Sequence, residues 1–240
     1  MHQSSHHLIF ASELRALLDP PPFDLHLHTS FTDGRCSVRE MLKSAERRGL
    51  ERIAFTEHVR RRITWWDAFR AEVAAEKAYF PFLDVLVGIE AKALDRSGNL
   101  DADEDLVQGS DLVLGAVHGF PAEHGGFLSP ESLTQEEAAL IEWETSLALL
   151  ERAPIDVLAH PGALTKKFFG GFPEAYLLSL ISKAAEREKA IELNAEYNSR
   201  EEIRFLLEAC REAGIRVSLG SNAHRSCEVG MIQECLKEVL

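Results

Sequence analysis

The alternation of short apolar runs with longer amphipathic segments constrains the fold of this chain more than any other feature of its sequence. Seven runs are rich in Val, Ile and Leu and have the length of buried strands. Because strands that alternate with helices form a parallel sheet, seven or eight such units close most naturally into an α/β barrel. The runs predicted as strands are residues 23–28, 52–58, 84–90, 112–118, 156–160, 190–194 and 216–221.

Helix-capping signals support the same alternation. Ser37 and Glu40 have the spacing of a capping box and precede a helix that is expected to end at Gly49. Residues 199–202 repeat this pattern before a helix that ends near residue 214. Helical periodicity also predicts helices at residues 65–79, 130–150, 173–188 and 228–240.

The chain before the first predicted strand forms a separate N-terminal part. Residues 1–22 are expected to be a polar tail and a short helix over 11–18, which the prolines at 20–22 end. Residues 23–240 then form a single barrel domain, because 240 residues with 45% hydrophobic side chains can bury one large core. We assign no function to the histidines of the tail, which are His2, His6 and His7.

Two irregular stretches interrupt the alternation. Residues 94–109 carry a cluster of carboxylates that could bind a cation, although a solvated loop is the simpler interpretation. Residues 119–129 carry His124 and are interpreted as a candidate lid without assigned chemistry. The acidic cluster consists of Asp101, Asp103, Glu104 and Asp105.

Charge and cysteine content argue against several partners and compartments. A formal net charge of −13 disfavours attraction to long nucleic acid or to an anionic membrane, because both require a basic surface. The sequence has no apolar run of about 18 residues that would span a membrane, and residues 1–10 do not resemble a secretory signal. The four cysteines show no C-x-x-C spacing or disulfide framework, so we expect a cytoplasmic protein. The sequence does not indicate an oligomeric state.

Six of the ten histidines lie at or just beyond the end of a predicted strand. In barrels of parallel strands the active site is built at the carboxyl ends of the strands, so these side chains should converge at one mouth. Two of them, in the run Asp24-Leu25-His26-Leu27-His28-Thr29, would also share one face of an extended strand. The six histidines are His26, His28, His58, His118, His160 and His224.

Two acidic residues and an amide join these histidines. Glu90 ends the third predicted strand, Asp33 lies in the turn after the first, and Asn222 offers an oxygen beside His224. Imidazoles and carboxylates in this proportion can bind two or three divalent ions, with Glu90 placed to bridge a pair. Two such ions can activate water and clamp a phosphoryl group, which predicts hydrolysis of a phosphate ester. The alternative is a set of separate core histidines, which would not explain their shared position at strand ends.

Six short motifs contain these residues in order along the chain. They are Asp24-x-His26-x-His28-Thr29 with Asp33-Gly34, Thr56-Glu57-His58, Gly88-Ile89-Glu90, Ala116-Val117-His118, His160-Pro161-Gly162 and Gly220-Ser221-Asn222-Ala223-His224. Together they resemble the motifs of the PHP (polymerase and histidinol phosphatase) family, from about residue 23 to the end of the last strand. The resemblance implies a distorted (β/α)7 TIM-like barrel with a trinuclear centre of zinc, manganese or iron that hydrolyses phosphate mono- or diesters.

The resemblance also implies which side chains hold each ion. One ion would be bound by His26, His28, Glu90 and the side-chain oxygen of Asn222. A second would be bound by Glu90, His118 and His160, and a third by Asp33, His58 and His224. Catalysis through the bound ions would then depend on His26, His28, Glu90, His118, His160 and His224, with metal-activated water attacking the phosphorus atom.

The chain departs from the family pattern at two positions. The family usually has aspartate where this chain has Asn222, and a neutral amide oxygen binds a metal more weakly than a carboxylate does. We expect either a full cluster of reduced affinity or a two-metal enzyme, because the other ligand positions are intact; loss of catalysis is the remaining outcome. Glu57 also stands where aspartate is common, in an orienting position that tolerates the change more easily.

A phosphate group in the site requires positive charge beyond the ions. Arginines and lysines follow several of the predicted strand ends, where they could rim the mouth and bind phosphate. Ordinary surface charges on loops are the alternative interpretation. The candidates for phosphate contact are Arg60, Lys166, Lys167 and Arg225.

The leading hypothesis is a metal-dependent phosphoesterase that acts on a small phosphorylated molecule. The short second motif and the length of the chain are similar to those of histidinol-phosphate phosphatases of the family. Three alternatives stay open: a phosphodiesterase on nucleotides or oligonucleotides, an amidohydrolase-like enzyme that cleaves a C–N bond, and a metal-binding barrel weakened by Asn222. Release of phosphate from histidinol phosphate or p-nitrophenyl phosphate distinguishes the leading hypothesis from the amidohydrolase. The effect of Asn222→Asp on phosphatase activity distinguishes a working enzyme from a weakened barrel.

Overall fold

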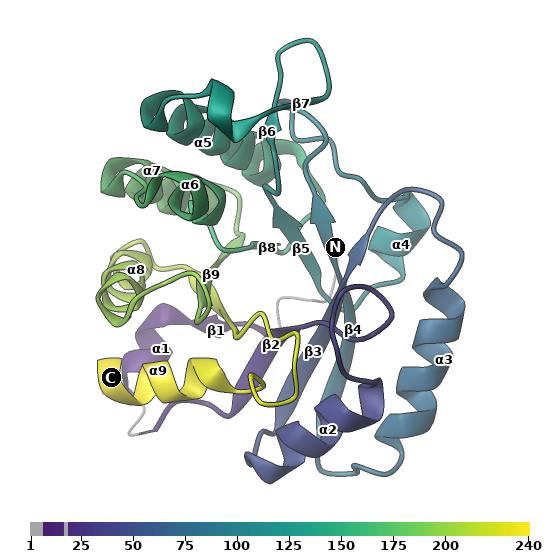
Figure 1. The fold of residues 1–240 in the computed structure, drawn as a ribbon. Coiled ribbons are helices and arrows are strands. Elements are labelled where there is room, and N and C mark those ends of the chain that lie inside the picture. The colour runs from purple at the N-terminus through teal and green to yellow at the C-terminus, as the bar shows by residue number, and fades with distance from the viewer. Residues whose placement is uncertain (1–6, 17–18) are drawn as a thin grey trace.

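A curled sheet of mainly parallel strands forms the centre of the computed structural model, which describes residues 7–16 and 19–240. Its hydrogen-bonded order is β1-β10-β9-β8-β5-β4-β3-β2, and every neighbouring pair except β1 with β10 is parallel. Each predicted strand region contains one parallel strand, so the predicted α/β barrel fold is confirmed (Figure 1). The parallel strands are β2 (Phe23–Leu27), β3 (Arg52–Val59), β4 (Asp84–Lys92), β5 (Val113–Ala116), β8 (Val157–Leu158), β9 (Ala190–Asn194) and β10 (Arg216–Gly220).

Strand β2, at one edge of the sheet, meets the chain that follows β10 at the carboxyl ends of the strands. There the backbone N–H of His28 donates to the carbonyl oxygen of Ala223 over 2.9 Å. The backbone N–H of Ala223 in turn donates to the carbonyl oxygen of His26 over 3.2 Å. At the opposite end the short strand β1 (Ile9–Phe10) pairs antiparallel with the start of β10. The barrel is therefore closed on the side where the predicted ligands lie, because these bonds fix β2 against the chain that follows β10.

The helices lie around the outside of the sheet (Figure 1). The capping boxes predicted at Ser37 and Ser199 are present. Within the described ranges, no helix has the length and apolar character that a membrane span requires. The helices are α1 (Ala11–Ala16), α2 (Val38–Arg47), α3 (Trp66–Lys77), α4 (Glu104–Gln108), α5 (Gln135–Arg152), α6 (Ala163–Phe169), α7 (Glu174–Glu186), α8 (Arg200–Glu212) and α9 (Met231–Val239).

The structure differs from the predicted elements in three places. The helix predicted over 130–150 is split, because Thr134 and Glu137 form a capping box that starts α5 after a separate 3-10 turn, Pro130–Ser132. The helices α4 and α6 were not predicted, since each is too short to show helical periodicity. The predicted lid contains a small hairpin of β6 (Phe120–Pro121) and β7 (Phe127–Leu128).

The residues before β2 are connected to the barrel through β1 and α1. Ala11 and Leu14 of α1 are fully buried in the main core. His7 is half-buried. The end of the helix predicted over 11–18, together with His2 and His6, lies outside the described residues.

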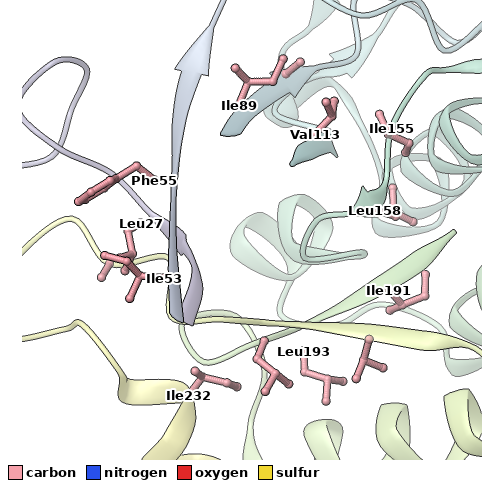
Figure 2. Close-up of a cluster of buried hydrophobic side chains, with 14 of the residues drawn as sticks. Leu27, Ile53, Phe55, Ile89, Val113, Ile155, Leu158, Ile191, Leu193 and Ile232 are labelled. Carbon is pink, nitrogen blue, oxygen red and sulfur yellow. The ribbon is translucent and has the colours of Figure 1, made fainter. Parts of the chain in front are cut away.

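Apolar side chains pack on both faces of the sheet. On β3, Ile53 and Phe55 belong to the large core between the strands and the helices (Figure 2). Ala54, on the opposite face, belongs to a smaller cluster of strand residues inside the barrel. Because side chains alternate along a strand, Thr56 and His58 continue this inner face. The inner face therefore changes from apolar to polar towards the carboxyl ends of the strands.

The acidic stretch of the loop over 94–109 holds the neighbouring arginine-rich turn. Asp101 accepts a hydrogen bond from the backbone N–H of Arg61 over 3.0 Å, and Asp103 accepts one from that of Arg62 over 2.7 Å. Asp101 also lies 3.7 Å from the ammonium group of Lys92. Asp101 and Asp103 therefore hold the neighbouring turn.

Glu142 of α5 holds the segment that follows His160. Its buried carboxylate accepts hydrogen bonds from the N–H of Leu164 over 3.2 Å and from the N–H and hydroxyl of Thr165 over 2.7 and 2.5 Å. These donors lie in the first turn of α6, which has no cap from its own preceding side chain. Burial raises the pKa of the Glu142 carboxyl group, although the bonds from Thr165 oppose the rise.

Because its pKa is raised, ionisation of Glu142 should lower the free energy of unfolding in a pH-dependent way. The folded chain holds this proton more tightly than the unfolded chain, so the free energy of unfolding falls as the pH rises above about 4.5. Glu142→Gln does not ionise and removes this dependence. Denaturant unfolding at several pH values should therefore show the wild type losing stability relative to E142Q as the pH rises. A constant difference would contradict the prediction, and Glu136→Gln, on the exposed face of α5, is the matched control.

Candidate metal centre

Glu90 lies at the centre of the predicted site. It lies near the carboxyl end of β4 with its side chain fully buried, and ring nitrogens of five histidines surround its carboxylate. The distances are 2.8 Å from Oε1 to His160 Nε2, 3.1 Å from Oε1 to His118 Nε2, 2.9 Å from Oε2 to His58 Nδ1, 3.4 Å from Oε2 to His26 Nε2 and 3.5 Å from Oε2 to His28 Nε2. The strand ends therefore bring these side chains into one cluster.

Asp33 and His224 complete the cluster on its solvent side. Asp33 Oδ1 lies 3.3 Å from His224 Nε2, and Asp33 Oδ2 lies 3.4 Å from His58 Nε2. The ring of His28 stacks on those of His58 and His224, with centroids 4.3 and 4.5 Å apart. The residues that the sequence places at separate strand ends thus form a continuous set of possible ligands.

Three groups of these side chains each place their ligand atoms within 4.8 Å of one another, close enough to hold an ion. The grouping differs in detail from the one that the resemblance implies, because His28 faces the Asp33 group and His58 also faces Glu90. The groups are His28 with Asp33, His58 and His224; His26 with Glu90 and His160; and His58 with Glu90 and His118. Because His58 and Glu90 are shared, the groups are adjacent positions in one centre.

Several buried atoms of the cluster lack a partner that the described residues supply. His28 Nδ1 has no hydrogen bond, Glu90 Oε2 faces three ring nitrogens without forming a hydrogen bond of good geometry, and the Nε2 atoms of His26 and His28 face each other over 3.1 Å. A buried polar atom without a partner costs about 1–3 kcal/mol. Cations among the inward-facing nitrogens and oxygens would satisfy them, so these side chains fit divalent metal ions.

The electrostatic environment favours the metal-binding protonation state at His28 and Glu90, whereas nearby carboxylates outweigh burial and raise the pKa values of His26 and His58. Burial and the neighbouring imidazoles of His58 and His26 hold the pKa of His28 well below its usual range, which keeps the ring neutral. Burial alone would raise the pKa of Glu90, but the surrounding histidines, His118 first, outweigh it and hold that pKa well below its usual range. Neutral imidazole and ionised carboxylate are the metal-binding forms.

Glu192 of β9 orients two of the candidate ligands. Its fully buried carboxylate accepts a hydrogen bond from His26 Nδ1 over 2.7 Å and from the backbone N–H of His160 over 2.8 Å. The first bond directs His26 Nε2 towards the cluster. The second holds His160 at a φ of 27°, in the left-handed region that costs energy outside glycine. A side chain at position 220 would clash with Glu192, so Gly220 leaves the necessary space.

Asn222 directs its amide oxygen at the cluster. Its Oδ1 lies 3.1 Å from His28 Nε2, and its Nδ2 donates to Glu196 Oε2 over 2.5 Å. The backbone carbonyl of Asn222 accepts from His224 Nδ1 over 2.8 Å, which directs His224 Nε2 at Asp33. Asn222 is nearly buried and has a φ of 51°, so its backbone, like that of His160, is strained at the site.

Glu57 supports the turn after β2. Its Oε1 accepts hydrogen bonds from the N–H and the hydroxyl of Thr29 over 2.8 and 2.5 Å, and its Oε2 accepts one from the hydroxyl of Thr32. Burial raises the pKa of Glu57 to about 7, although these bonds oppose the rise. Glu57 therefore fixes the turn that carries Asp33.

Three of the four predicted phosphate contacts reach hollows over the cluster. Lys167 lines a hollow of about 230 Å³ beside the histidines, and Arg225 and Arg60 line neighbouring hollows on either side. Lys166 lines none of these three hollows and instead donates to the carbonyl oxygen of Tyr197 over 2.7 Å and to a carboxylate of α8.

Sequence analysis did not identify several residues at this site. The sequence did contain a signal for Glu192, because a carboxylate in the middle of an otherwise apolar strand requires a buried partner. No sequence pattern indicates the contact of Glu196 with Asn222, because this contact depends on the path of the loop after β9. Other residues that line the hollows without having been predicted are Arg35, Lys92 and Tyr197.

Comparison with known proteins assigns the chain to a family. A model of the PHP domain matches residues 24–196, a range that includes every candidate ligand except Asn222 and His224. The chain belongs to the PHP domain family. This membership and its phosphatase relatives confirm the predicted resemblance and the class of metal-dependent phosphoesterase.

Individual relatives share most of the chain. A protein named "Probable phosphatase" from Acetivibrio thermocellus is 29% identical over 223 residues, which cover 89% of this chain and 84% of the relative. The "DNA polymerase/3'-5' exonuclease PolX" of Bacillus subtilis is 29% identical over 210 residues, which cover 84% of this chain and 34% of that protein. A crystal structure of histidinol phosphate phosphatase from Lactococcus lactis, complexed with zinc, L-histidinol and phosphate, has a TM-score of 0.69 at 19% identity and covers 90% of this chain and 93% of its own. At that identity the structural likeness shows the fold.

Glu192→Gln tests the orienting role of the buried carboxylate. The variant keeps the shape of the side chain but removes the charge that holds the Nδ1 proton of His26, so we expect Zn²⁺ to bind about 10- to 100-fold more weakly. Competition with a chromophoric chelator measures this affinity. Glu212→Gln, at an exposed position of α8, makes the same change of charge and should bind Zn²⁺ as the wild type does. Equal affinity in E192Q and the wild type would contradict the orienting role.

Proposed function

We propose that this chain is a phosphomonoesterase that acts on a small phosphorylated molecule with divalent metal ions held at the Glu90 cluster. The observation that carries the proposal is the buried Glu90 carboxylate among five imidazoles at the carboxyl ends of parallel strands. The proposed ligands are His26, His28, Asp33, His58, Glu90, His118, His160, Asn222 and His224. Zinc, manganese and iron all suit this mixture of nitrogen and oxygen ligands.

The side chains of the site have two roles in hydrolysis: some hold the metal ions, and others bind the phosphate group. Bound divalent ions supply Lewis-acid chemistry and lower the pKa of water in sites of this kind. The histidines and carboxylates fix the positions of the ions, and the charges at Lys167, Arg225 and Arg60 bind phosphate oxygens at the rim of the hollows. Burial of Glu90 keeps water away from its carboxylate and strengthens these electrostatic interactions.

Histidinol phosphate is the first substrate to test. The Lactococcus lactis enzyme of similar fold is described with L-histidinol and phosphate, which together are the products of such a hydrolysis. A phosphodiester is the second candidate, because the Bacillus subtilis relative is named as a polymerase and exonuclease. The net charge of −13 supports the small substrate, since long nucleic acid requires a basic surface.

Removal of metal tests the proposed function. We expect the purified chain to contain about two to three divalent ions and to release phosphate from histidinol phosphate or p-nitrophenyl phosphate. Dialysis against a chelator should abolish the release, and Zn²⁺ or Mn²⁺ should restore it. Glu90→Gln should lower the rate by about 10²- to 10³-fold or more, because the ions lose their shared carboxylate.

Two controls make the result specific. Bis(p-nitrophenyl) phosphate and an N-acyl amino acid report phosphodiesterase and amidohydrolase activity, and faster turnover of either would replace the phosphomonoesterase proposal. Glu188→Gln, an exposed carboxylate after α7, should keep both metal content and rate. A preparation that neither contains nor takes up metal would contradict the proposal.

A further inference from the structure

The hydrogen bond between Glu196 and Asn222 joins an exposed carboxylate to a nearly buried amide at the edge of the cluster. Asn222 Nδ2 donates to Glu196 Oε2 over 2.5 Å, while Asn222 Oδ1 lies 3.1 Å from His28 Nε2. Among the ion pairs of the described residues, no Lys or Arg side chain pairs with Glu196. Its carboxylate is therefore directed at the amide and not at a surface cation.

The chemistry of the two groups determines which way the amide points. An ionised carboxylate only accepts hydrogen bonds, so the amide nitrogen of Asn222 must face Glu196. The amide oxygen then faces the histidines, in the orientation that offers a metal ion a lone pair. Without Glu196 the amide could rotate and present its NH₂ group, which has no lone pair to donate to a cation.

We infer that Glu196 is a positioning residue that locks the Asn222 amide with its oxygen towards the metal centre. The inference rests on the proposed metal centre and assigns a role to a residue outside the predicted ligand set. Glu196 also places a negative charge next to the one amide ligand of the centre, where it strengthens the polarisation of the amide. The locked pair then supports cation binding better than an isolated amide does.

The effect of removing Glu196 should depend on the residue at position 222. In the wild-type background, Glu196→Ala releases the amide, so the weakest bound Zn²⁺ should lose about 10-fold or more in affinity. With Asn222→Asp, either oxygen of the carboxylate can face the metal, so Glu196→Ala should cost nothing.

A double-mutant cycle measures this dependence. Zn²⁺ affinity is read by competition with a chromophoric chelator for the wild type, E196A, N222D and E196A/N222D, with thermal unfolding to check the fold. Glu196→Gln, which keeps an acceptor and removes the charge, should lie between the wild type and E196A. Glu201→Ala, an exposed glutamate of α8, is the control and should bind Zn²⁺ as the wild type does.

The possible outcomes separate the inference from the proposed function. An equal cost of E196A in both backgrounds, or no cost in either, would overturn the positioning role while leaving the metal centre in place. A wild-type chain that binds no Zn²⁺ would overturn both.

A second, independent observation is an apolar cavity of about 330 Å³ beside His118. The β6–β7 hairpin supplies Phe120, Phe127 and Leu128 to its walls, and α6 supplies Leu164 and Phe168. Phe127 and Phe168 are 46% and 48% exposed, although large aromatic side chains are usually buried further. The cavity has the size of a small ligand pocket.

This cavity adjoins the metal centre. His118 and Leu164 line both the cavity and the hollow over the Glu90 cluster. A phosphate ester bound at the cluster can therefore place the group on its alcohol oxygen between Phe127 and Phe168. The structure assigns this cavity as a subsite for an apolar or aromatic group on the alcohol side of the ester, an assignment that rests on the proposed phosphomonoesterase.

Two esters of matched chemistry test the subsite. 2-Phenylethyl phosphate and ethyl phosphate have similar leaving groups, but the first carries a ring that can enter the cavity. Burying an aromatic ring contributes about 1.5–3 kcal/mol, so kcat/KM should be roughly 10- to 100-fold higher for 2-phenylethyl phosphate. Phe168→Ala and Phe127→Ala should each raise KM for this ester and leave ethyl phosphate unchanged.

Phe82→Ala is the control, because Phe82 is 94% exposed and does not line the cavity. Equal kcat/KM for the two esters, or an equal effect of the variants on both, would overturn the subsite. If p-nitrophenyl phosphate and both esters release no phosphate, the proposed function fails together with it.

Discussion

A carboxylate buried among five imidazoles is the interaction on which the rest of the structure depends. Burying Glu90 and its histidines without bound ions would cost folding free energy. Several of their nitrogens and oxygens would lack hydrogen-bond partners, and neighbouring charges would repel one another. Metal ions resolve both problems, since each cation provides partners for inward-facing atoms and compensates the carboxylates. The apolar core beneath the strand ends and around the sheet provides the stability that makes this polar mouth possible.

The cluster is held by a surrounding set of buried acids from distant parts of the chain. Asp24 of β2 accepts hydrogen bonds from the backbone N–H of Ser221 over 2.9 Å and from that of Gly230 over 2.7 Å, which connects β2 to the chain that follows β10. Glu192 joins His26 to the His160 backbone, and Glu142 holds the helix that follows. Each carboxylate fixes a segment that carries a ligand, so a small shift in any one would move the centre.

The sequence was sufficient to predict the parallel strands and the gathering of the histidines and Glu90 at their carboxyl ends, because both follow from local patterns. Apolar runs predict parallel strands, and residues just past each run lie at one mouth, as His118 and His160 do. Contacts between distant loops were not predictable. The direction of Lys166 and the pairing of Glu196 with Asn222 depend on how the loops after β8 and β9 pack, which no periodicity records. Short elements such as α6 were missed because one or two turns do not show a helical period.

X-ray absorption spectroscopy of the Zn²⁺-loaded chain tests the central claim most directly. If the Glu90 cluster binds the ions, the spectrum should show zinc surrounded by imidazole nitrogens and carboxylate oxygens at about 2.0–2.2 Å and a second zinc at about 3.5–4 Å. A single isolated zinc without imidazole scattering, or a chain that retains no zinc, would contradict the account.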